Sequence, residues 1–332
     1  MTAILGRPQA PCGGNKKAKK LFFSKTTRNP KHFWDAIKTK FSDKNLKAEG
    51  RIHLLENNIL HTSDEHVADI FNSYFNRVTE TLEIPTWSNQ NTSLSSEDIS
   101  ETNFENHPSI KEINSHRNSD EVFDFAKVDE SQVFKVIASL NNSKSVSGTI
   151  PTRMLKIAAN ICVPYLTSCF NNCVEDGIFP DRLKLADIIP VFKKGSSTDK
   201  VNYRPISLLP VVSKIFERLI VNQLNVHFEP QFSKLLCGFR KGHSTQHAIL
   251  NMIRNWQSAI ANNLKVGAVL IDLSKAFECL PHDLLLAKLP AYGLSESAVK
   301  LMHSYLSDRK HRVRIGSNFG LISCLVYHKD LF

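Results

Sequence analysis

Long uninterrupted apolar runs are missing from this chain. No stretch approaches the roughly eighteen apolar residues of a membrane-spanning helix, and residues 1–20 contain no apolar segment of the kind found in secretion signals. These absences argue against membrane insertion and against secretion. We therefore expect an intracellular protein, in the cytoplasm or the nucleus, with no membrane partner.

Paired metal-binding residues are missing too. The seven cysteines are scattered, and neither Cys-x-x-Cys nor His-Glu-x-x-His occurs, which argues against a zinc site. Cys162, Cys169 and Cys173 are predicted to share one face of an apolar helix, as core thiols in a reducing compartment would. Phosphate-loop and Gly-x-Ser-x-Gly strings are also absent, which argues against a motor NTPase and a serine hydrolase.

Basic residues, in contrast, are abundant and unevenly placed. The 332 residues carry a net charge of +10, and the 42% hydrophobic content is ordinary for a globular protein with room for two domains. Residues 181–318 hold 20 Lys and Arg against 10 Asp and Glu, whereas residues 86–130 hold 3 against 10. A basic region suits a partner that bears phosphates, because neutralising phosphates supplies most sequence-independent nucleic-acid affinity. The alternative is a basic surface that only confers solubility.

Hydrophobic spacing predicts a mixed helix and strand organisation. The capping box Thr62-Ser63-Asp64-Glu65 predicts a helix over about 63–80, and the polar composition of residues 86–121 predicts a linker. A second helical part begins at Asp129, and we expect Pro164 to kink one of its helices and Gly177 to end it. The remaining helices are expected at 151–176, 211–227, 244–262, 282–292 and 295–306, and strands at 186–192, 203–209, 266–272 and 312–315.

Within the 151–176 helix, one apolar stripe is predicted to face the core. Its members are Met154, Leu155, Ala158, Ile161, Cys162, Tyr165, Leu166, Cys169 and Cys173.

Four strings in this order carry most of the functional information. Asp272 ends the apolar run 266–271 and opens the string Asp-Leu-Ser-Lys-Ala-Phe. A carboxylate at the tip of a buried strand is a metal-ligand position; the alternative is an Asp that caps the following helix. The three strings before it are Ile-Ile-Pro-Val-Phe-Lys-Lys-Gly at 188–195, Asn-Tyr-Arg-Pro-Ile-Ser-Leu-Leu at 202–209 and Gly-Phe-Arg-Lys-Gly-His-Ser-Thr at 238–245.

Taken together, these strings resemble the reverse transcriptase, an RNA-directed DNA polymerase, of a jockey-like non-LTR retrotransposon. The resemblance covers roughly residues 20–318 and implies an α+β fold, namely a partial right-hand polymerase with helical fingers, a β-hairpin and the first part of a palm sheet. The implied organisation has five parts: a basic, helical connector upstream of the polymerase (1–85), an acidic flexible linker (86–128), fingers (129–262), the start of the palm (263–318) and an unrelated tail (319–332). The family's Gly-Val-Pro-Gln-Gly-Ser and Ala-Asp-Asp strings do not occur in the sequence, so we expect a chain truncated before the Ala-Asp-Asp motif.

The resemblance also assigns roles around Asp272. It implies a two-metal mechanism in which Asp272 and the Leu273 carbonyl bind Mg²⁺. Lys275 and Ala276 would offer backbone amides to the incoming triphosphate, and Phe277 would be the steric gate against a ribose 2′-hydroxyl. The alternative for Phe277 is a buried core residue. The family usually has Asp where this chain has Glu278.

Upstream, the resemblance implies a nucleotide site and a template site. Arg204 matches a triphosphate-binding arginine, whose planar fork suits phosphate oxygens, and Lys193 or Lys194 matches the basic residue of the facing strand. The alternative for the two lysines is simple solvation. Template contacts are implied for Gly238, Phe239, Arg240 and Lys241, although Leu236 and Cys237 replace the family's usual Gln and aromatic residue.

Three functions follow as hypotheses. The first is a fragment of an RNA-directed DNA polymerase, with RNA template, DNA primer and dNTP as partners, that is inactive as an isolated chain because one carboxylate cannot hold two metals. The second is a nucleic-acid-binding remnant without chemistry, and the third is a degenerate retroelement relic. The oligomeric state is left open by the sequence.

Overall fold

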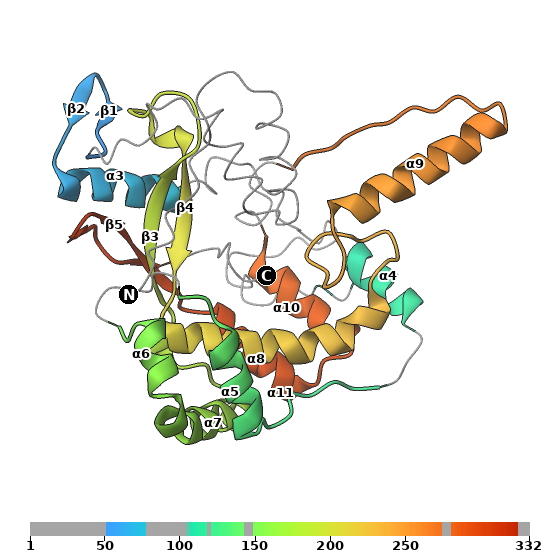
Figure 1. The fold of residues 1–332 in the computed structure, drawn as a ribbon, viewed down its shortest axis with the longest axis horizontal. Coiled ribbons are helices and arrows are strands. Elements are labelled where there is room, and N and C mark those ends of the chain that lie inside the picture. Colours follow the sequence, from blue (N-terminus) through green and yellow to red (C-terminus); the bar gives the residue numbers. More distant parts are fainter. Residues whose placement is uncertain are drawn as a thin grey trace, which may run out of the picture. The chain divides into compact units, whose positions relative to one another are not determined.

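A computed structural model describes residues 51–77, 104, 106–117, 121–142, 149–273 and 280–324 (Figure 1). The chain divides into two compact units, Met1–Arg51 and Ile52–Phe332, and every described helix and strand belongs to the second. That unit combines sheets with helices, which confirms the α+β class. None of the helices in the described ranges is long and apolar enough to cross a membrane.

A five-stranded sheet contains the predicted hairpin. β3 (Leu185–Phe192) and β4 (Tyr203–Leu208) pair antiparallel, with Val191 opposite Arg204. β5 (Lys310–Ile315), which includes the predicted strand 312–315, runs parallel to β3, and β6 (Asn318–Phe319) and β7 (Ser323–Cys324) pair with β5. The sheet therefore joins residues from both sides of the boundary that we predicted between 262 and 263.

A second, smaller hairpin was not predicted. β1 (Leu54–Glu56) and β2 (Ile59–His61) are joined by Asn57 and Asn58, whose φ angles are 52° and 64°. Two asparagines with positive φ form the tight turn that matches the twist of paired strands. The Leu55 N–H donates to the Thr198 carbonyl at 2.8 Å, which ties this small hairpin to the loop between β3 and β4.

α3 (Asp64–Arg77) covers one face of the main sheet, as the predicted 63–80 helix requires. Val67 and Phe71 from the predicted stripe are buried, whereas Val78 lies outside the described residues. Alternate residues of a strand point to opposite faces of the sheet. Every second side chain of these strands therefore points toward α3. The resulting core consists of Leu54, Val67, Ala68, Phe71, Ile188, Tyr203, Val313 and Ile315.

The helical part forms a second core around α8, and the predicted helix positions are confirmed with shifts of a few residues. Asp129 caps α5 in a capping box with Gln132, and Gly177 ends α7 with a left-handed φ of 64°. In chain order the helices are α5 (Glu130–Ser139), α6 (Thr152–Ile157), α7 (Ala159–Asp176), α8 (Val211–Phe228), α9 (Thr245–Ala261), α10 (His282–Ala291) and α11 (Glu296–Leu306), with short 3-10 turns η1 (Asp181–Leu183), η2 (Lys200–Asn202) and η3 (Glu229–Gln231).

Two details of the predicted 151–176 helix were wrong. The helix is broken at Ala158, whereas Pro164 lies in the second turn of α7, where it removes a single intrahelical hydrogen bond. The break rotates α7, so the buried face runs through Val163, Phe170 and Cys173. Much of the predicted stripe faces solvent instead, including Met154, Ile161, Tyr165 and Cys169.

Part of the predicted 86–121 linker is a helix. α4 (Pro108–His116) starts with the His107 side chain accepting from the Ser109 N–H, has Pro108 in its first turn and buries Ile110. It packs against α10, and just downstream Phe123 pairs with Leu294 in a β-bridge. A proline at the start and one buried apolar residue were enough to order this short polar segment against the core.

The predicted strand at 266–272 is wrong in the described chain. α9 has no buried residue, and residues 264–273 after it form neither helix nor strand. Val269, Leu270 and Ile271 are all more than four-fifths exposed. An apolar run becomes a strand only when a neighbouring strand accepts its hydrogen bonds, and none of the described strands pairs with this one.

Candidate nucleotide and nucleic-acid site

Arg204 lies on the solvent side of the β3–β4 hairpin. Its neighbour Tyr203 points into the core under α3, so the alternation of the strand turns Arg204 to the opposite face, beside exposed Val191 and Ile206. Within the described ranges no ion pair or side-chain hydrogen bond joins Arg204. An exposed guanidinium beside apolar side chains can bind a phosphate together with a sugar or base.

Lys193 and Lys194 are exposed at the end of the same hairpin, so the structure brings them near Arg204 in the strand register. The Lys193 N–H donates to the Asn202 carbonyl at 2.8 Å, and the Tyr203 hydroxyl donates to the Ser197 carbonyl at 2.7 Å. These bonds fix the loop that carries the lysines. Gly195, with φ 91°, allows the Asn202 side chain an approach that a Cβ would block.

Two further arginines on this face of the sheet were missed by the sequence analysis. Arg312 Nε donates to Asp187 Oδ1 at 2.8 Å and Arg314 Nη1 to Asp187 Oδ2 at 3.4 Å, and the Asp187 side chain is wholly buried. The Arg312 guanidinium also lies 4.0 Å from the Phe319 ring centre. The sequence did contain a signal for this cluster, namely an Asp inside one apolar strand and an Arg-x-Arg alternation in another. A buried carboxylate needs cationic partners, so the two patterns could have been connected.

The predicted template segment is an exposed turn before α9. Phe239 is 81% exposed and has a φ of 57°, a left-handed conformation that is unusual for an aromatic residue. Lys241 is exposed, whereas Arg240 is engaged: it pairs with Glu229 at 2.9 Å and donates to the Ser233 carbonyl at 3.3 Å. Nothing lies near the position of a Cβ on Gly238, so the backbone there is open to a ligand.

Asp272 and Leu273 are both exposed at the end of the irregular segment. Lys275, Ala276, Phe277 and Glu278 lie outside the described residues. Among the residues that the structure describes, no group of three or more His, Cys, Asp or Glu could hold a metal ion. The described donors around Asp272 therefore do not by themselves form a Mg²⁺ site, which requires several oxygen ligands.

Buried titratable groups support the sheet from the helical side. Burial raises the pKa of Glu217 on α8, against the effect of Arg309 and of the Tyr305 hydroxyl, which donates to Glu217 at 3.0 Å. Arg309 Nη2 lies 3.6 Å from Glu217 Oε1 and the side chain is almost fully buried. This pair fixes the start of β5 against α8.

Comparisons with known proteins relate part of this chain to one family. Residues 191–326 match the family described as reverse transcriptase (RNA-dependent DNA polymerase). The match contains the last two residues of β3, all of β4, the turn before α9, Asp272 and β5, and it extends beyond residue 318, where the resemblance was expected to end.

Among curated proteins the chain is similar to polymerases of Drosophila melanogaster mobile elements. It is 31% identical over 205 residues to the probable RNA-directed DNA polymerase from transposon BS, covering 57% of this chain and 21% of the relative. It is 31% identical over 190 residues to that of the X-element (56% and 21%) and 30% identical over 189 residues to that of jockey (55% and 20%). The resemblance to jockey-like non-LTR retrotransposon reverse transcriptases is thereby confirmed.

The chain spans about a fifth of the length of these relatives.

Proposed function

We propose that this chain carries the fingers of an RNA-directed DNA polymerase and that the β3–β4 hairpin binds the incoming dNTP. The observation that carries this proposal is the exposed, unneutralised Arg204 beside Lys193 and Lys194. The guanidinium fork binds two phosphate oxygens of a triphosphate, and the lysines act as point charges on the rest. The buried Asp187 pairs with Arg312 and Arg314, deeper on the sheet, whereas Arg204 has no ion pair among the described residues.

The turn 238–241 supplies the contact to the RNA template in this proposal. Phe239 offers an aromatic surface on which a base can stack, and Lys241 meets a phosphate. Because Arg240 is paired with Glu229, its part is to hold the turn in shape. The RNA strand and the DNA primer would thus lie against residues that α9 and the hairpin present to solvent.

The reaction class is nucleotidyl transfer from a dNTP to a primer 3′-hydroxyl. By family, Asp272 and the Leu273 carbonyl are the metal ligands, Lys275 and Ala276 hold the triphosphate, and Phe277 is the steric gate. We assign no catalytic step to these residues, because no group of three or more His, Cys, Asp or Glu that could hold a metal forms within the described part of the chain.

The sequence contains no Ala-Asp-Asp string, and the isolated chain is expected to bind without extending a primer. Both the first hypothesis, a polymerase fragment that is inactive as an isolated chain, and the second, a nucleic-acid-binding remnant, predict this result.

A pair of assays tests the proposal. Fluorescent dTTP is titrated against the chain and against Arg204→Ala, with Arg153→Ala as control, since Arg153 is an exposed arginine on α6. We expect the hairpin variant to bind at least about tenfold more weakly, the loss typical of a charged phosphate contact, and the control to be unchanged. Equal affinity of all three proteins would refute the nucleotide site.

The second assay is primer extension with Mg²⁺ on a poly-ribonucleotide template, where no product above background is expected. Extension that disappears in Asp272→Asn would instead show an active enzyme and exclude the binding-only function.

A further inference from the structure

α9 presents a continuous apolar stripe to solvent. Its four central side chains, each at least 37% exposed, are Ile249, Ile253, Trp256 and Ile260. The helical period of 3.6 residues places them on one face of α9, whereas Arg254, its only Lys, Arg, Asp or Glu, lies on the other face. No residue of α9 is buried, and neither core of the described chain includes one.

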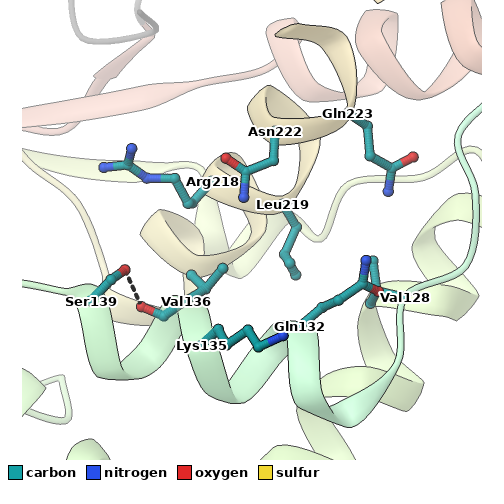
Figure 2. Close-up of a pocket in the computed structure, with 9 residues that line it drawn as sticks. All are labelled: Val128, Gln132, Lys135, Val136, Ser139, Arg218, Leu219, Asn222 and Gln223. Atoms are coloured by element: carbon teal, nitrogen blue, oxygen red, sulfur yellow. Dashed lines mark hydrogen bonds between the residues drawn. The ribbon is translucent and has the colours of Figure 1, made fainter. Parts of the chain in front are cut away.

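α9 lacks the packing partner that a helix of its length needs. Its 17 residues include Asn251 and Asn255, which favour helices weakly, and an isolated helix of about 12–15 residues is marginal in water. α5 and α8 show how such a helix is usually stabilised: Val136 and Leu219 are buried between them, beneath a groove of about 320 Å³ (Figure 2). No described element covers α9 in this way, so its stripe requires a surface from elsewhere.

The spacing of the stripe indicates what that surface is. Successive members are four, three and four residues apart, which is the spacing of core positions in a pair of helices packed knobs into holes. The steps are the same in both chain directions. Two antiparallel copies of α9, related by a two-fold axis, therefore place Ile249 against Ile260 of the second copy and Ile253 against Trp256 of the second copy. The seam between the copies contains no charge, because Arg254 lies on the opposite face of each helix.

We propose that the apolar stripe of α9 is the interface of a homodimer of this chain. With the flanking Leu250 and Met252, the stripe offers on the order of 600 Å² per copy, somewhat less than the roughly 800 Å² that each partner buries in a standard interface. The dimer is therefore weak and reversible, with a dissociation constant on the order of 10 µM. It leaves the polar face of α9 open to nucleic acid and does not involve the hairpin, so it is independent of the proposed nucleotide site.

Sedimentation velocity of nuclease-treated protein between about 1 and about 100 µM tests the interface, because these concentrations bracket the expected dissociation constant. We expect the wild-type mass to rise from monomer to dimer. Ile253→Lys and Trp256→Glu should each raise the dissociation constant at least about tenfold, since an unpaired charge in the seam is costly. Their matched controls, Ser258→Lys and Asn255→Glu, add the same charges on the polar face and should dimerise as the wild type does.

A mixture of the two interface variants distinguishes pairing through the seam from simple loss of the helix. In the antiparallel pair the new lysine faces the new glutamate, so the equimolar mixture should recover a dimer although neither variant dimerises alone. Absence of this recovery refutes the two-fold seam.

Two further outcomes overturn the proposal. One is a wild type that stays monomeric; a lower melting temperature of Ile253→Lys would then show that another segment of the chain covers the stripe. The other is equal dimerisation of the wild type, both interface variants and both controls, which places the contact elsewhere. Leu270→Lys is run in parallel and should keep the dimer, which separates pairing through α9 from self-association through residues 264–273.

Discussion

At the scale of single residues, the sequence analysis identified most of the exposed Lys and Arg residues of the site. It did not reveal which of them form ion pairs. Arg204 and Arg240 look equivalent in the sequence, each beside an aromatic residue, yet the first is free in solvent and the second is paired with Glu229. The difference depends on Glu229. This residue lies eleven residues before Arg240 in the sequence, and the path of the chain brings the two side chains into hydrogen-bond contact. Pairing of this kind follows from the tertiary path of the chain, which spacing alone does not reveal.

Phe239 provides a test at this scale. A left-handed conformation costs an aromatic residue about 1 kcal/mol or more, and an 81% exposed side chain gains little burial in return. Phe239→Gly should therefore raise the free energy of unfolding by about 1 kcal/mol and weaken RNA binding severalfold, because base stacking is lost. Urea unfolding and anisotropy measure the two effects.

Phe239→Tyr is the matched control, since it keeps both the strain and the ring. Unchanged RNA affinity in the glycine variant would show that Phe239 does not contact the template.

At the scale of elements, the sequence predicted the structure well where the signals for a helix or hairpin lie within that element itself. The β3–β4 hairpin and α3, α5, α8, α10 and α11 were found from alternation, helical spacing and caps. The β1–β2 hairpin was missed because its Asn57-Asn58 turn was not recognised as a turn signal. The 266–272 strand was predicted from its apolar run alone, and such a run does not say whether a neighbouring strand is present to pair with it.

β5 gives a prediction about pH. His311 is 2% exposed, neither ring nitrogen has a hydrogen-bond partner in the described structure, and burial lowers its pKa to about 4. The unfolded chain takes up a proton near pH 6.5 and the folded chain only near pH 4, so stability should fall as the pH drops through this window. The full effect is about 3 kcal/mol, with no contribution above pH 6.5.

His311→Leu should remove this pH dependence and take the two unpaired ring nitrogens out of the core. Urea unfolding of both proteins at pH 7 and pH 5 gives the difference. Glu217, whose pKa burial raises, acts in the opposite direction in both proteins and cancels in the comparison. An identical loss of stability in the two proteins would mean that His311 is accessible to protons when folded.

At the scale of the whole molecule, the chain passes from the helical core into the sheet core more than once. β3 follows directly from α7 through the η1 turn and carries Ile188 into the sheet core, while β5 follows α11 and pairs with β3. The cationic hairpin is therefore joined to the helical part at one end of the sheet, where β3 and β5 begin and β4 ends. The irregular 264–273 segment that leads to Asp272 lacks such support, and this explains why the sequence predicted the structure of the hairpin better than that of the segment around Asp272.

The same segment should control the solubility of the isolated chain. Leu270 is 91% exposed between two other exposed apolar residues, and an unpaired apolar run with high strand propensity is a site of self-association. We expect Leu270→Lys to reduce concentration-dependent light scattering severalfold while leaving the melting temperature unchanged, because the side chain contributes no buried surface. Val226→Lys, which adds the same charge at an exposed position of α8, is the control and should leave the scattering high. A lowered melting temperature in Leu270→Lys would show instead that the segment packs against the folded body in solution, and Asp272 would then be held in place by the chain itself.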